Sequence, residues 1–376
     1  MRVYFITGTT GVVGSALVPF LLEDTDTEVV LLIRAADDTD LARRLDALFA
    51  FWGPERAHAW RDRIRALRGD AAEPAFGLAA GEYRRLSERC THIIHSAGTV
   101  KMNLPIEEAR RSAVASVREI LALARLVEQR GGLAKVEVVS TVGIAGKRAG
   151  ALPERWIDEP RAFHNTYEQA KSEAEDIVRE AIEREGLPIT VHRPSMVVGD
   201  SRDGRVIHFQ IFYFICEFLS GRRTFGLYPD FGGVQLDIVP SDFVARAIAA
   251  SSREASTAGR IFHLSSGPAH APRIEEMKGI VRAAWRAHGL EVPSAITLPR
   301  HLYGRLARAA SWIVPGALRK PLSTLPIYLD YLADRQGFDN RELATWLAAR
   351  GTSVPRARDY LPVVLGRYLA ERHRRG

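Results

Sequence analysis

The sequence predicts an α/β fold in which a doubly wound parallel sheet is followed by a smaller, mostly helical C-terminal region. Two observations predict the sheet: short apolar segments alternate with amphipathic helical stretches over the first two hundred residues, and a glycine-rich turn follows the first segment. A change of composition after residue 200 predicts the second region. The expected strands are 2–6, 28–33, 64–68, 91–95, 135–140 and 189–193.

The first strand leads into TGTTGVVG at residues 7–14, which gives the spacing G-x-x-G-x-x-G between a strand and a helix expected at 12–22. Without side chains, the backbone N–H groups of such a turn approach a pyrophosphate, and the helix N-terminus adds a partial positive charge. This pattern predicts a dinucleotide-binding turn of the Rossmann type, and a plain glycine turn is the alternative. The expected cofactor contacts here are Gly8, Thr10, Gly11, Val12, Val13 and Gly14.

The second strand ends at Arg34, where an acidic residue would normally bind the ribose hydroxyls of NAD. An arginine suits a 2′-phosphate instead, through charge-assisted hydrogen bonds, and Arg44 supplies a second cation. The sequence therefore predicts NADP(H) rather than NAD(H). The alternative is that both arginines belong to the solvated surface. That alternative competes most strongly for Arg44, so Arg34 carries the prediction.

Tyr167 and Lys171 stand four residues apart in NTYEQAKSEAE, downstream of the glycine turn. Residues at this spacing share one face of a helix, so a phenol and an ammonium can converge on one reacting group. A proton donor beside a cation, together with a dinucleotide turn, predicts a nicotinamide-dependent active site.

Composition limits the other classes of function. The chain has 376 residues and only two cysteines, Cys90 and Cys216, which excludes a disulfide framework or a cysteine-rich metal site. No secretion signal and no apolar run of about 18–20 residues is visible, so we expect a cytoplasmic protein with no transmembrane segment. The histidines lack carboxylate or cysteine neighbours at ligand spacing, and no metal is expected.

The formal net charge is +7. Nucleic acid is one partner that such a charge can bind, but no binding motif or basic stripe interleaved with aromatic residues accompanies it. An anionic cofactor or substrate explains the charge equally well, and we expect no nucleic-acid partner.

The pattern also divides the chain into two domains. Residues 1–200 plus 236–267 form the expected NADP-binding Rossmann domain, and residues 201–235 plus 268–376 form the expected substrate-binding cap. Residues 206–219, VIHFQIFYFICEFL, are dominated by apolar side chains. They suit either the lining of an apolar substrate cleft or an ordinary buried helix, and composition leaves both interpretations open.

The order of these motifs resembles the extended short-chain dehydrogenase/reductases, and within them the branch of thioester reductases and fatty acyl-CoA reductases. The resemblance spans most of the chain, and the ordered set is more specific than any single motif. The motifs that carry it are TGTTGVVG, LLIRA, HSAG at 95–98, VVSTVG at 138–143, the Tyr167 and Lys171 pair, HRPSMVVGDSRDG and LDIVPSDFVARAI.

The resemblance implies roles for individual residues. Thr141 corresponds to the hydroxyl that hydrogen-bonds the substrate carbonyl, with Ser140 as the second candidate. Tyr167 corresponds to the acid, and Lys171 to the residue that holds the nicotinamide ribose and lowers the tyrosine pKa. Further implied cofactor contacts are Asp70, Ala97, Gly98, Pro194, Ser195 and Met196.

One position departs from the family pattern. The helix after Lys101 usually contains an asparagine that organises a proton relay, and Ala113 stands in its place. The leading expectation is reduction of a thioester with NADPH to an aldehyde and possibly an alcohol, on acyl-CoA or an acyl-carrier protein with an apolar acyl group. The alternatives are an NADP-dependent alcohol or ketone dehydrogenase on an apolar, sterol- or terpenoid-like substrate, a sugar-nucleotide epimerase or dehydratase, and a non-catalytic NADP-binding sensor.

Overall fold

A seven-stranded, all-parallel sheet forms the centre of the computed structural model, which describes residues 1–313 and 336–373. Its strand order is β11-β7-β5-β4-β1-β2-β3. All six predicted strands are confirmed, each to within one residue at either end. The strands are β1 (Arg2–Thr7), β2 (Thr27–Ile33), β3 (Ile64–Arg68), β4 (His92–His95), β5 (Lys135–Val139), β7 (Ile189–Pro194) and β11 (Ile261–Leu264).

The chain order reverses beside β1, because β2 and β3 lie on one side of it and β4, β5 and β7 on the other. Ligands of open parallel sheets bind outside the carboxyl ends of the strands at such a switch point. Thr7 and His95 are paired at the carboxyl ends of β1 and β4. This edge of the sheet is therefore where a site is expected.

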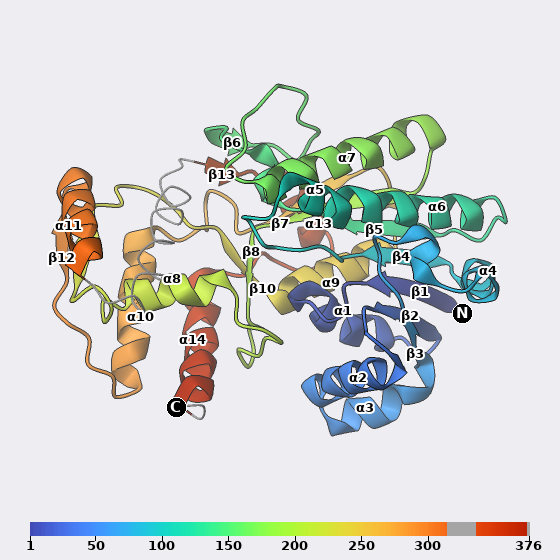
Figure 1. Ribbon diagram of the computed structural model, residues 1–376, viewed down its shortest axis with the longest axis horizontal. Helices are drawn as coiled ribbons and strands as arrows, with labels where there is room; N and C mark the ends of the chain where they lie inside the picture. The colour runs from blue at the N-terminus through green and yellow to red at the C-terminus, as the bar shows by residue number, and fades with distance from the viewer. Residues whose placement is uncertain (314–335, 374–376) are drawn as a thin grey trace.

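Helices cover both faces of the sheet (Figure 1). On one face, the core contains side chains of α1, α2, α9 and α13, and on the other it contains side chains of α4, α6 and α7. These helices are α1 (Val12–Leu22), α2 (Asp38–Trp52), α9 (Ser241–Ser252), α13 (Arg341–Ala348), α4 (Ala80–Arg89), α6 (Ser116–Glu128) and α7 (Thr166–Glu185). Shorter pieces are α3 (Pro54–Trp60), α5 (Ile106–Arg110), the 3₁₀ turns Arg61–Arg63, Pro74–Gly77, Val142–Ala145 and Ala255–Thr257, and the π-turn Arg111–Ala115.

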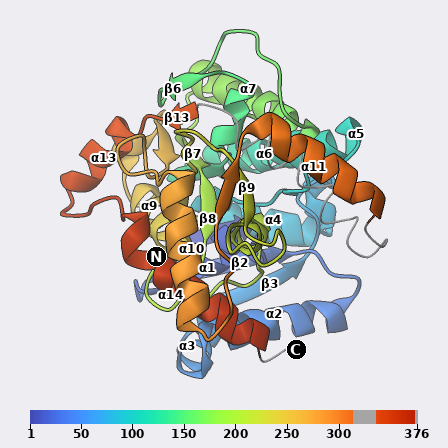
Figure 2. The ribbon, with the colours of Figure 1, turned by 90° about the vertical axis from the view of Figure 1, so that its left-hand side faces the viewer.

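A second apolar core lies beside the sheet and is built mainly from helices, as Figure 2 shows for α10 and α14. Phe212, Trp285 and Tyr360 are among its fully buried side chains. The predicted mostly helical C-terminal region is confirmed for the described residues, while 314–335 and 374–376 lie outside them. Its elements are α8 (Ile211–Leu219), α10 (Ile274–Ala287), α11 (Arg300–Ile313), α14 (Ala357–His373) and the paired short strands β8 (Met196–Val198) with β10 (Ile238–Pro240), β9 (Leu227–Pro229) with β12 (Ile296–Leu298), and β6 (Gly150–Leu152) with β13 (Gln336–Phe338).

The stretch 236–267 contributes β10, α9 and β11. Of these, β11 pairs with β7 at the edge of the large sheet, and α9 packs against α1. The division into 1–200 plus 236–267 and 201–235 plus 268–376 remains a prediction. Across the described part of the chain, none of the helices combines the length and apolar character needed to cross a bilayer.

Candidate active site

A cavity of about 1020 Å³ opens beyond the carboxyl ends of β1, β4, β5 and β7. We call it the main cavity. It collects residues from the glycine turn, from the segments after β4 and β5, from α7 and from the α8 region. Twelve of the predicted site residues line it: Gly8, Gly11, Val12, Val13, Gly14, Gly98, Thr141, Tyr167, Lys171, Pro194, Ser195 and Met196. The remaining five, Thr10, Arg34, Arg44, Asp70 and Ala97, lie outside its lining.

The glycine turn touches the turn after β4 through backbone atoms alone. Gly8 has a positive φ of 77°, and a Cβ placed on it would lie 2.5 Å from the nitrogen of Ala97. A Cβ on Gly14 would overlap the carbonyl oxygen of Gly8. The glycines are therefore required by close packing, and they leave a smooth cradle before the N-terminus of α1, where Gly11 is the N-cap. Such a cradle suits a pyrophosphate.

Three predicted catalytic side chains converge on the main cavity. Thr141 precedes the turn after β5, where its hydroxyl accepts a hydrogen bond from the Gly143 nitrogen at 3.1 Å. Tyr167 lies in the first turn of α7, and its phenol is hydrogen-bonded to the Thr141 side chain. One helical turn later, the buried Lys171 donates from Nζ to the carbonyl oxygen of Val139 at 3.0 Å.

Burial controls the protonation of this group. It raises the pKa of Tyr167 to about 12, against a smaller lowering by the Thr141 hydrogen bond, so the phenol holds its proton at neutral pH. Burial lowers the pKa of Lys171 to about 8, opposed by the nearby Glu175 carboxylate. The sequence prediction that Lys171 lowers the Tyr167 pKa is not seen in this structure. The ammonium bonds the backbone of β5, and burial outweighs the other effects on the phenol.

The two predicted phosphate-binding arginines have different surroundings. The Arg34 side chain is 82% exposed, and its guanidinium lies 3.9 Å from Asp70, the implied adenine contact. By contrast, Nε of Arg44 donates to the Asp40 carboxylate at 2.9 Å, one turn away on α2. Arg34 and Asp70 thus lie together beyond β2, and Arg44 already has a carboxylate partner.

The residues 206–219 satisfy both interpretations of their composition, on opposite sides. Phe212, Tyr213 and Cys216 are buried in the second core. The other side of the segment contributes Phe209 and Phe214 to the main cavity. Apolar residues from elsewhere complete this wall of the cavity: Val100, Met102, Leu104, Met196 and Phe338.

Sequence reasoning missed a polar pair beside the catalytic tyrosine. His164 lines the main cavity, and its Nδ1 lies 2.9 Å from the buried Glu168 carboxylate. The side chain of Asn165 caps α7 by accepting from the Glu168 nitrogen at 3.0 Å. The signal was present, because Asn165 and Glu168 have the N-cap and N3 spacing of a helix start.

Asp237 was also missed, and no local signal identifies it. It lines the cavity after pairing of β10 with β8 brings it there, and it accepts from the nitrogens of Ser266 at 2.8 Å and Gly267 at 3.0 Å. Burial raises its pKa to about 6, while these hydrogen bonds lower it. Its contacts hold the segment after β11 against the cavity wall.

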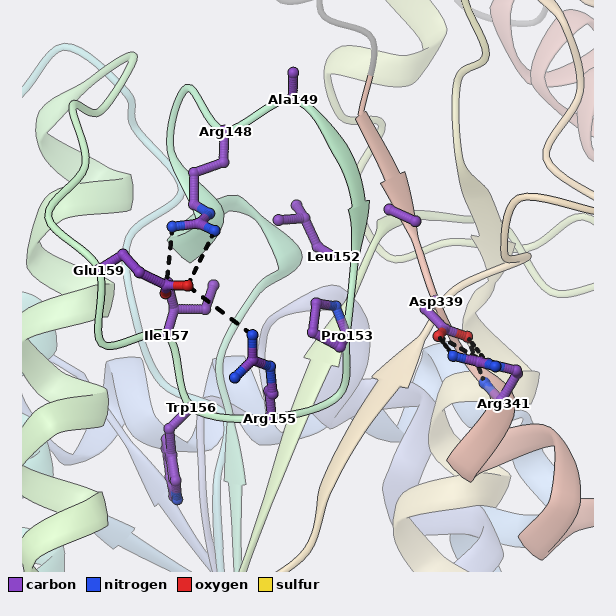
Figure 3. A pocket seen from close by; sticks show the side chains of 11 residues that line it. Arg148, Ala149, Leu152, Pro153, Arg155, Trp156, Ile157, Glu159, Asp339 and Arg341 are labelled. Carbon is purple, nitrogen blue, oxygen red and sulfur yellow. Dashed lines mark hydrogen bonds and ion pairs between the residues drawn. The ribbon is translucent and has the colours of Figure 1, made fainter.

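A smaller pocket of about 310 Å³ lies beside the paired strands β6 and β13 (Figure 3). Its arginines already have carboxylate partners. Arg148 and Arg155 both face Glu159, and Arg341 pairs with Asp339 at 2.6 Å on the other side (Figure 3). Residues 1–313 and 336–373 contain no group of three or more histidine, cysteine, aspartate or glutamate residues arranged to hold a metal ion.

Comparison with known proteins agrees with this geometry. The family described as male sterility protein matches residues 6–248, which include the glycine turn, Thr141, Tyr167 and Lys171. The chain belongs to this family. It is an extended short-chain dehydrogenase/reductase of the thioester reductase branch, an oxidoreductase with an NAD(P)-binding domain.

Individual relatives place the chain more closely. It superimposes on the terminal R domain from the myxalamid PKS-NRPS biosynthetic pathway with a TM-score of 0.80 and 28% identity, covering 100% of this chain and 91% of that one. It is 30% identical to glycine betaine reductase ATRR of Emericella nidulans over 70% of this chain and 21% of that protein. A linear gramicidin synthase of Brevibacillus parabrevis is 30% identical over 69% of this chain. The chain spans only 5% of that synthase.

Proposed function

We propose that the protein reduces a thioester with NADPH, releasing an aldehyde and a thiol. The observation that carries the proposal is the convergence of Thr141, Tyr167 and Lys171 on one cavity beside a glycine cradle. Family membership supports the same reaction class. A non-catalytic sensor has no need for a buried lysine and a hydrogen-bonded Tyr–Thr pair at that point.

The cavity residues fit a nicotinamide dinucleotide. Gly8, Gly11 and Gly14 would hold the pyrophosphate, because side chains at Gly8 and Gly14 would collide with neighbouring backbone. Lys171 would hold the nicotinamide ribose, and the exposed Arg34 guanidinium would bind a 2′-phosphate. Arg44 contributes less, since Asp40 competes for it. Bound NADPH supplies hydride to the substrate carbonyl carbon.

The protein's own groups act on the carbonyl oxygen. Thr141 and Tyr167 donate hydrogen bonds to it as negative charge develops, and Tyr167 then transfers its proton. The product is a hemithioacetal. When its hydroxyl returns a proton to Tyr167, the C–S bond breaks and the thiolate leaves, taking a proton from solvent. A protonated phenol at neutral pH, as its raised pKa requires, is the state that this step needs.

The substrate is an acyl group held by a phosphopantetheine arm. The wall formed by Phe209, Phe214 and Phe338 favours an apolar acyl chain. A carrier protein is the preferred source of the arm over coenzyme A, because the relatives include the terminal R domain of a PKS-NRPS pathway and a linear gramicidin synthase.

The test is oxidation of NADPH with matched acyl groups presented on coenzyme A, on an isolated phosphopantetheinylated carrier protein, and as free ketones. Consumption with thiol release supports the proposal, and a higher kcat/KM on the carrier identifies the preferred arm. Turnover of ketones without turnover of any thioester would replace the proposal with an apolar ketone or alcohol oxidoreductase.

A further inference from the structure

His95 is a buried histidine beneath the cavity that the proposed mechanism does not use. It ends β4 and has no exposed surface. Its Nδ1 lies 2.8 Å from the Thr7 hydroxyl, and its Nε2 lies 3.2 Å from the Ser116 hydroxyl. Burial, helped by the charge of Lys171, lowers the pKa of His95 to about 3. The ring is therefore neutral, with one donor nitrogen and one acceptor nitrogen.

The neighbouring bonds fix which nitrogen is which. The Ser116 hydroxyl lies 2.7 Å from the carbonyl oxygen of Ser112, and it can only donate there. Ser116 therefore accepts from His95 Nε2–H, which leaves Nδ1 to accept from Thr7. The Thr7 hydroxyl in turn accepts from the Ala97 nitrogen at 3.3 Å. One directed chain thus runs from the turn after β4, through β1 and the imidazole, to the π-turn.

This chain holds the cavity-lining turn 96–99 from both sides. At its start, the Ser96 hydroxyl donates to the carbonyl oxygen of Thr7 at 2.8 Å. At its end, the Thr99 nitrogen donates to the Ser112 hydroxyl at 2.9 Å. Between them, a Cβ placed on Gly98 would lie only 3.4 Å from Lys171 Nζ. The position of this turn therefore sets the distance between the glycine cradle and the lysine.

The π-turn Arg111–Ala115 makes the second anchor possible. A π-turn widens a helix locally, and such turns recur at functional sites. Here it places the hydroxyl of Ser112 against the turn 96–99 and that of Ser116 against His95. Ala113, between them, is buried and has no polar side-chain atoms. Ser112 and Ser116 supply the hydrogen bonds on this side of the cavity.

We propose that His95 is a positioning residue for the nicotinamide nucleotide, acting through the turn 96–99 on the Gly8 cradle and Lys171. The inference rests on the proposed use of the main cavity for this nucleotide and does not depend on the thioester. Removing the imidazole leaves the Thr7 and Ser116 hydroxyls without their buried partner, which frees the turn to move.

The experiment compares His95→Leu with His92→Leu. His92 lies on the same strand, is also buried, and burial lowers its pKa to about 4. Its contacts are the Thr91 hydroxyl at 2.8 Å and the Tyr4 ring, so it does not touch the cavity-lining turn. Kd for NADPH and NADH is measured by fluorescence titration, beside kcat and the thermal midpoint.

His95→Leu is expected to raise the Kd of the preferred nucleotide about 10–30-fold, since two hydrogen bonds are lost. His92→Leu is expected to change this Kd less than twofold while lowering the thermal midpoint comparably. His95→Gln, which offers a donor and an acceptor, should return Kd to within about threefold of the parent. Ser116→Ala keeps the ring and should raise Kd about 3–10-fold.

Equal effects of His95→Leu and His92→Leu on Kd would overturn the inference, as would an unchanged Kd in Ser116→Ala and His95→Gln if the leucine variant does not fold. An unmodified protein that binds neither nucleotide would instead refute the assignment of the cavity. Binding of nucleotide without thioester turnover would refute the proposed reaction alone.

Discussion

Replacing Gly8 with alanine tests the close contact between the glycine cradle and the turn after β4. The methyl group would lie 2.5 Å from the nitrogen of Ala97 and 2.6 Å from the carbonyl oxygen of Ser96. Both neighbours are backbone atoms that are hydrogen-bonded to β1 or adjacent to such groups. They cannot rotate away as a side chain would, so the turn itself must shift.

Two costs add in this variant. Gly8 has a φ of 77°, and an L-residue in that left-handed region costs about 1–2 kcal/mol. Overpacking against fixed neighbours costs a further 1–3 kcal/mol or so. The free energy of unfolding should therefore fall by about 2–5 kcal/mol. Gly131 separates the two costs, because its φ is 70° and no atom lies within 4 Å of its Cβ position. Gly131→Ala should cost only about 1–2 kcal/mol.

The assay is urea-induced unfolding followed by tryptophan fluorescence, with nucleotide titration on the same samples. We expect Gly8→Ala to be destabilised more than Gly131→Ala and to lose at least about tenfold in nucleotide affinity, because its turn is displaced. Gly131→Ala should bind like the parent. Equal destabilisation in the two variants, with nucleotide affinity intact in both, would show that the cradle and the turn are not in the contact described.

Three further predictions concern the site. Tyr167→Phe should lower kcat/KM by about 10²–10⁴ in steady-state kinetics while leaving nucleotide Kd within about twofold, since it removes only the proton donor; an unaffected rate would remove Tyr167 from the mechanism. Because Lys171 has its pKa lowered to about 8 from its usual 10.5, its charge is lost as pH rises through 8, so nucleotide affinity should fall there. Between pH 8 and 10.5 the unfolded chain binds the extra proton, so stability should rise with pH relative to Lys171→Met, and parallel curves would contradict the assignment. Arg34→Ala should raise Kd for NADPH about 10–100-fold and leave NADH unchanged, with a smaller effect from Arg44→Ala; equal losses for both nucleotides would argue against a 2′-phosphate contact.

The sheet was predictable because its strands are buried on both faces and appear as short, nearly continuous apolar runs. Residues directly after such strands meet at one edge of a parallel sheet. That geometry explains why Gly8, Gly98 and Thr141, which are far apart in sequence, all line one cavity. The family pattern then placed Tyr167 and Lys171 in the same cavity.

The residues that sequence reasoning missed owe their positions to tertiary pairing. Asp237 reaches the cavity because β10 pairs with β8, and no periodicity announces a three-residue strand pair. His95 meets Ser116 only through a π-turn, which helical spacing does not anticipate. The partner of Arg44 was visible, since Asp40 precedes it by four residues on the expected helix, a spacing at which opposite charges pair.

The most direct test of the central claim is a stoichiometric one. NADPH oxidation and free thiol are measured together during turnover of a carrier-bound acyl thioester, with Tyr167→Phe as the control. The account predicts one thiol released for every one or two NADPH consumed, according to whether reduction stops at the aldehyde, and loss of both signals in the variant. NADPH oxidation without thiol release, or equal rates in parent and variant, would contradict thioester reduction at this site.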